Sequence, residues 1–135
     1  MLRKIIVKPH LFFFGLVPLF VILGLSKKEN YINLSFNYLI FDLDISLICN
    51  ISAVFFLLIG FNYYSLYWVQ KFPKKSLTIS HILLQLLSLI PFILLVFSFN
   101  FSQTYLVLIG SFIVFLFSII IHLINFFTSL LLKTK

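Results

Sequence analysis

The stretch from Ser76 to Leu132 reads SLTISHILLQLLSLIPFILLVFSFNFSQTYLVLIGSFIVFLFSIIIHLINFFTSLLL and contains no Lys, Arg, Asp or Glu. A transmembrane helix needs about 20 mostly apolar residues, so this stretch can hold two of them. Residues 9–26 and 45–70 are also free of charged residues, and each has the length of one span. These three stretches predict four membrane-spanning helices.

We expect an all-α, multi-pass integral membrane four-helix bundle made of one domain, residues 1–135. The predicted spans are Leu11–Leu25, Ile45–Val69, Leu77–Phe99 and Tyr105–Leu132. Polar residues at 100–104 predict a turn between the last two helices, and Pro73 follows the second helix. Pro18 and Pro91 lie inside spans, where we expect kinks.

The composition supports this class and excludes others. The chain is 62% hydrophobic and 10% charged, whereas an ordinary soluble domain has roughly 25% charged residues. The net charge of +7 does not indicate nucleic-acid binding, because the basic residues lie at the ends of apolar spans. The expected partner is the lipid bilayer. Abundant Phe, Ile, Lys and Asn suggest an AT-rich genome and a bacterial inner membrane.

Basic residues predict the orientation. Eight of the ten fall on the side that carries both termini: Arg3, Lys4, Lys8, Lys71, Lys74, Lys75, Lys133 and Lys135. The positive-inside rule therefore places both termini in the cytoplasm. An alternative concerns the first span, because Gly24-Leu25-Ser26 after an apolar run resembles a signal-peptide cleavage site. Cleavage there would leave three spans.

Polar and small residues recur at helical spacing within the last three spans. They are Ser46, Asn50, Ala53, Gly60 and Tyr64 in the second span, Thr78, His81, Gln85 and Ser88 in the third, and Ser111, Ser118, His122, Asn125 and Ser129 in the fourth. Such stripes face the interior of a bundle, where polar groups bond across helices. We expect the stripes to pack together and most Phe, Leu and Ile residues to face lipid.

His81 and His122 are the candidate site residues. Intramembrane ionisable residues are functional candidates by default, and histidines from facing helices can ligate haem. Counting about 1.5 Å per residue from the predicted span ends gives depths of roughly 6 and 15 Å, a mismatch that the over-long fourth span could reduce. The simpler alternative is a neutral His122 hydrogen-bonded to Ser118, Asn125 or Gln85. No cofactor is therefore our primary expectation.

The sequence contains no catalytic motif, and we expect no enzyme and no metal site. It has no nucleophile elbow, phosphate loop, carboxylate pair within a span or Cys/His cluster. Asp42 and Asp44 precede the second span, where either could cap its helix and favour the positive end of the helix dipole.

One region resembles the catalytic subunit I of haem-copper cytochrome oxidases. The matching pieces, in order, are Ile32–Tyr38, Ala53–Tyr64 (AVFFLLIGFNYY), the basic loop Lys71–Lys75 (KFPKK) and His81. The start KPHLFF, residues 8–13, is similar to that of small subunit-I-like membrane proteins of Bacteroidetes. The resemblance covers somewhat over a third of the chain and implies a degenerate, truncated relative of the subunit.

The departures from that family concern its metal ligands. The positions corresponding to its haem-ligating histidines fall on Leu43 or Asp44 and on Ile45 or Ser46, and the outer His-Asp pair falls on Ser35 and Phe36 or one position later. The helices that carry the copper ligands are absent from this chain. The resemblance thus implies a scaffold without the oxygen-reducing chemistry.

We therefore expect a non-catalytic inner-membrane protein that associates with other membrane subunits or with itself. Two alternatives belong to other classes. One is a redox module that holds a haem between His81 and His122. The other is a small transporter or channel subunit, which would need to oligomerise to enclose a pathway.

Overall fold

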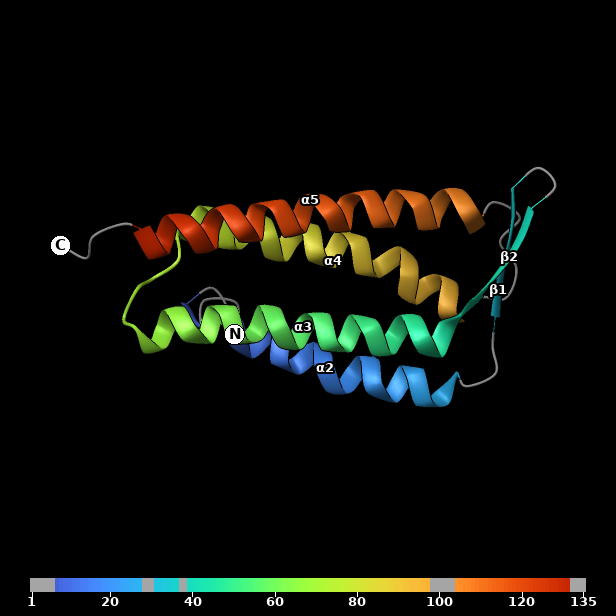
Figure 1. Cartoon of the computed structure of the whole chain (residues 1–135), viewed down its shortest axis with the longest axis horizontal. Coiled ribbons are helices and arrows are strands. Elements are labelled where there is room, and N and C mark those ends of the chain that lie inside the picture. Colours follow the sequence, from blue (N-terminus) through green and yellow to red (C-terminus); the bar gives the residue numbers. More distant parts are fainter. Residues whose placement is uncertain (1–6, 28–30, 37–38, 98–103, 132–135) are drawn as a thin grey trace. The chain divides into compact units, whose positions relative to one another are not determined.

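The computed structural model describes residues 7–27, 31–36, 39–97 and 104–131. Its helices are α2 (Pro9–Ser26), α3 (Ile45–Trp68), α4 (Lys75–Phe97) and α5 (Thr104–Leu131), and its strands are β1 (Tyr31–Phe36) and β2 (Leu39–Asp44) (Figure 1). All four helices are long and apolar enough to span a membrane. The predicted all-α, multi-pass membrane fold is confirmed.

The predicted spans agree with the helices to within two residues at every end. Pro9 occupies the first turn of α2, where its missing N–H costs no hydrogen bond. Pro18 and Pro91 lie inside α2 and α4, and each helix continues through its proline. The predicted cytoplasmic termini and most of the predicted polar turn at 100–104 lie outside the described residues.

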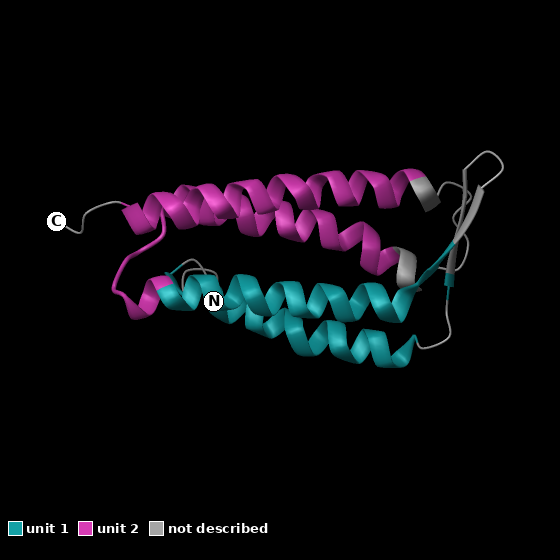
Figure 2. Cartoon of the chain, in the orientation of Figure 1, with its two compact units in different colours: residues 1–65 teal, residues 66–135 magenta. Residues whose placement is uncertain are grey.

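The chain divides into two compact units, residues 1–65 and 66–135, which are coloured separately in Figure 2. The first unit contains α2, the two strands and most of α3. The second contains the last turn of α3 with α4 and α5. Each unit is described by itself below.

In the first unit, aromatic side chains fill the contact between α2 and α3. The ring of Phe13 stacks on Tyr63, with 5.7 Å between the ring centres and 14° between the planes. Phe20 meets Phe56 edge to face at 5.0 Å. All four side chains are at most 1% exposed. The expectation that most Phe, Leu and Ile residues face lipid therefore does not hold for Phe13, Phe20 and Phe56, whose rings fill the interior of this helix pair.

Two glycines allow the same helices to approach closely. A Cβ atom at Gly60 would lie 2.5 Å from Cε1 of Phe14, and one at Gly24 would lie 3.3 Å from Cβ of Cys49. The predicted stripe on α3 is confirmed in part, since Ala53 and Gly60 are buried. Its polar members are not fully buried: Ser46 is half-buried, and Asn50 and Tyr64 are exposed.

The strands were not predicted. β1 and β2 pair antiparallel in a register that runs from Tyr31 opposite Asp44 to Phe36 opposite Leu39. α3 begins directly after β2, and the Asp44 carboxylate accepts a hydrogen bond from the Ser46 amide at 2.8 Å. Asp44 is thus the helix cap expected at this position, whereas Asp42 lies opposite Asn33 in the hairpin.

Candidate functional site

Buried polar side chains line the contact between α4 and α5 in the second unit. We call this set the polar seam; its members are Thr78, His81, Gln85 and Ser88 on α4 and Ser118, His122, Asn125 and Ser129 on α5. Each is at most 4% exposed. These are the predicted stripes of the third and fourth spans, with the exception of Ser111, which is only half-buried.

The first contact of the seam fixes the start of α4 against α5. The Asn125 side chain accepts a hydrogen bond from the backbone N–H of Lys74 and donates one to Thr78 Oγ1, each at 3.0 Å. Thr78 Oγ1 in turn donates to the Lys74 carbonyl at 3.1 Å. One amide therefore bonds both to the backbone preceding α4 and to the first turn of that helix.

A second group of hydrogen bonds lies further along α4. Ser118 Oγ is 3.2 Å from Gln85 Oε1 and 3.4 Å from the His81 carbonyl, so the hydroxyl can donate to either oxygen. Gln85 Nε2 donates to Ser88 Oγ at 3.4 Å, and Ser88 donates to the Gln85 carbonyl at 2.8 Å. These bonds satisfy polar groups that would be costly to expose to lipid.

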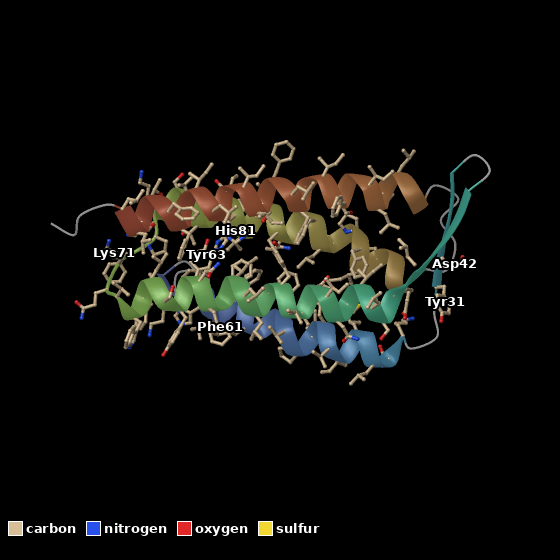
Figure 3. The ribbon with its side chains drawn as sticks, viewed as in Figure 1. Tyr31, Asp42, Phe61, Tyr63, Lys71 and His81 are labelled. Atoms are coloured by element: carbon tan, nitrogen blue, oxygen red, sulfur yellow. The ribbon has the colours of Figure 1, made fainter. Side chains whose placement is uncertain are left out.

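Between these two groups, the rings of His81 and His122 are in contact. Their centres are 4.9 Å apart and their planes differ by 32°; Figure 3 marks His81 on α4. The two histidines lie side by side despite the difference in counted depth, because α5 extends past the start of α4: Asn125 already bonds to Lys74, which precedes α4, and α5 continues to Leu131. The structure thus brings together the two candidate site residues.

The three contacts share one antiparallel register. Thr78 lies opposite Asn125, His81 opposite His122 and Gln85 opposite Ser118. The steps of three and four residues along α4 equal the steps back along α5. Since residues three and four apart share a helix face, the seam is a ladder of matched side chains.

Lys71 adds a charged contact at one end of this unit. Its ammonium group donates a hydrogen bond to the Leu130 carbonyl, in the last turn of α5 (Figure 3). The C-terminal carbonyls of a helix carry partial negative charge and lack partners within the helix. A cation at this position is therefore favourable.

The arrangement of the two histidines does not fit a haem. An iron with two axial histidines lies between them, one on each side of the macrocycle. Each axial histidine directs one ring nitrogen at the iron from its own side of the macrocycle, so two such rings cannot contact each other as those of His81 and His122 do, with 4.9 Å between their centres. Haem binding would require α4 and α5 to separate and would break the hydrogen bonds that flank the pair.

Other sites are not evident among the described residues. In that part of the chain no three His, Cys, Asp or Glu residues are close enough to hold a metal ion. A surface hollow of about 350 Å³ on α3 is lined by Asn50, Ile51, Val54, Phe55 and Leu58, none of which ionises. His10, in the first turn of α2, is buried and meets Tyr64 edge to face at 5.6 Å.

Comparison of the chain with protein-family models, with curated proteins and with solved structures gives no match.

Proposed function

We propose that this multi-pass membrane protein is a non-catalytic accessory subunit, which packs beside other integral membrane subunits. The complex indicated by the sequence resemblance is a haem-copper oxidase, to whose subunit I this chain would be a degenerate relative. The proposed place of action is a bacterial inner membrane.

The observation that supports this role is the direction of the hydrogen bonds in the polar seam. Asn125 bonds to Thr78, and Ser118 bonds to Gln85, so these groups serve to join α4 to α5. A catalytic site needs polar groups directed at a substrate in an accessible pocket. Here they bond to each other in a buried contact, which is the arrangement of a structural helix pair.

The outer surface of α5 is consistent with packing against lipid or another subunit. Large apolar side chains are exposed along the described helix, among them Phe112, Leu116, Phe117, Ile120 and Phe127. Because lipid tails are also apolar, helices associate in membranes through shape and not through hydrophobic exclusion. An apolar face of this kind can contact a neighbouring subunit without any charge of its own.

The test is purification of the tagged chain from its native membranes in a mild detergent. We expect oxidase subunits to co-purify in constant ratio through a second, size-based step. A four-span protein with the same tag, prepared from the same membranes, is the control for non-specific capture. Recovery of the chain as a lone monomer would contradict the accessory role.

A visible spectrum of the purified chain separates this proposal from the haem alternative. We expect no Soret band from the isolated chain, because the ring contact between His81 and His122 leaves no gap for a macrocycle. A Soret band that disappears in His122→Ala but persists in His10→Ala would contradict the proposal of a non-catalytic accessory subunit.

A further inference from the structure

The strand pairing in the β-hairpin places apolar residues on one face and its polar residues on the other. Successive residues of a strand alternate between its two faces, so alternate cross-strand pairs share a face. One set of pairs is entirely apolar: Ile32 with Leu43, Leu34 with Phe41, and Phe36 with Leu39. We call these six positions the apolar face. The other set contains Tyr31 with Asp44, Asn33 with Asp42, and Ser35 with Ile40.

The apolar face of the hairpin must pack against other apolar groups for the hairpin to be stable. An isolated pair of strands is at best marginally stable in water and requires its apolar side to be packed. Leu43 is the one member of the apolar face whose side chain is described, and 36% of its surface is exposed. At this position the described chain therefore leaves the face partly open.

The hairpin is attached to two spans at the same end of the first unit. β2 ends at Asp44 and α3 begins at Ile45, with no residue between them. β1 begins shortly after α2 ends at Ser26, and Gly24 in the last turns of α2 approaches Cys49 in the first turns of α3. The hairpin therefore adjoins one end of the α2–α3 pair, where β1 begins and β2 ends (Figure 1).

We propose that the hairpin lies on the membrane surface, with its apolar face in the boundary between lipid head groups and acyl chains. The Asn33–Asp42 side then faces water, where a carboxylate is well hydrated, and Asp42 and Tyr31 are indeed exposed (Figure 3). Lipid is the occupant because the bilayer surrounds the spans from which both strands emerge. This inference goes beyond the accessory role and does not depend on it.

Two adjacent cross-strand pairs provide the test. In a Cys49→Ala background, single cysteines replace Leu34 or Phe41 on the apolar face and Asn33 or Asp42 on the other. Each is labelled with an environment-sensitive fluorophore after reconstitution into phosphatidylcholine–phosphatidylglycerol vesicles. Because neighbouring positions face opposite sides, we expect lipid-borne spin labels to quench positions 34 and 41 about twofold or more strongly than 33 and 42. Aqueous iodide should show the reverse preference.

Two results would overturn the proposal. Equal quenching at all four positions would show that the faces do not differ in their contact with lipid. Labels at 34 and 41 that are shielded from both lipid and iodide would show that protein, such as a second copy of this chain, covers the face.

A label-free version tests whether the fluorophore disturbs the hairpin. In a Trp68→Phe background, Leu34→Trp should be quenched by brominated lipid more than Asn33→Trp, since the two positions lie on opposite faces. The same order in both experiments supports lipid contact, and loss of the difference in the tryptophan variants contradicts it.

Discussion

The two helix pairs of this protein are held together in different ways. α2 and α3 meet through stacked rings and close-approach glycines, whereas α4 and α5 meet through hydrogen bonds and paired histidines. A bilayer provides no hydrophobic force between helices, so each pair needs another source of association. One pair relies on shape and the other on polar chemistry.

The difference affects how each pair fixes its register. The polar seam specifies one alignment, because a shift of one residue would separate all three matched contacts at once. In the first unit, Gly60 receives the ring of Phe14, and a shift would place a side chain in that position. The register of α2 against α3 is therefore set by the space available for side chains. This helix pair should be more sensitive than the α4–α5 pair to added atoms.

The largest effect is expected from adding a side chain at Gly60. A leucine there would overlap the ring of Phe14, since even a Cβ atom would lie 2.5 Å from Cε1. We expect Gly60→Leu to lower the free energy of unfolding by about 3 kcal/mol, the upper part of the range for overpacked interiors. The measurement is SDS titration of the detergent-solubilised protein, followed by far-ultraviolet circular dichroism.

Gly15 on α2 provides the matched control for this substitution. A Cβ atom at Gly15 would meet nothing within 4 Å, so Gly15→Leu should leave the free energy of unfolding within about 0.5 kcal/mol of the original value. Equal destabilisation by the two substitutions would contradict a close contact at Gly60.

Removing a ring from the same contact should have the next largest effect. Phe56 packs against Phe20 at 5.0 Å and lies near Phe13 at 6.5 Å, and it is 1% exposed. We expect Phe56→Ala to cost about 2 kcal/mol, below the roughly 3–5 kcal/mol of soluble cores, because lipid replaces water around the unfolded helices. Phe61→Ala, at an exposed ring, should cost less in the same titration. A cost equal to that of Phe56→Ala would count against ring packing as the source of stability.

The spans and the polar seam could be predicted from the sequence, because both follow periodic signals. Absence of charge marked the helices, and steps of three and four residues marked the seam. The hydrogen-bond partners required more than periodicity. The step from Thr78 to Gln85 fits several alignments with α5, and only the packed structure selects Asn125 and Ser118 as the partners.

Two features were missed for physical reasons that can be identified. Phenylalanine suits both lipid and a packed interior, so its frequency did not indicate which rings are buried, as Phe13 and Phe20 are. The hairpin does carry a period-two signal, from Ile32 through Phe36. Each strand has only six residues and β2 adjoins a long apolar helix, so this signal is weak beside that of the spans.

In the second unit, loss of an amide should cost less than loss of a ring. Asn125 makes two hydrogen bonds across the seam, and interhelical hydrogen bonds in membranes average about 0.6 kcal/mol each. We expect Asn125→Leu to lower the free energy of unfolding by about 1.2 kcal/mol in the same titration. Asn50→Leu, at an exposed amide on α3, is the control and should have little effect. A larger cost for Asn125→Leu than for Phe56→Ala would reverse the order argued for the two helix pairs.

The smallest effect is the coupling between two single side chains of the seam. Ser118 Oγ and Gln85 Oε1 are 3.2 Å apart, so a double-mutant cycle of Ser118→Ala with Gln85→Leu should give a coupling of about 0.6 kcal/mol. The cycle of Ser118→Ala with Thr78→Val should be additive, because Thr78 bonds to Asn125 instead. Coupling in the first cycle alone would show that the seam acts through matched pairs. Equal coupling in both would mean that it acts as one cooperative network, in which case the register would not depend on individual contacts.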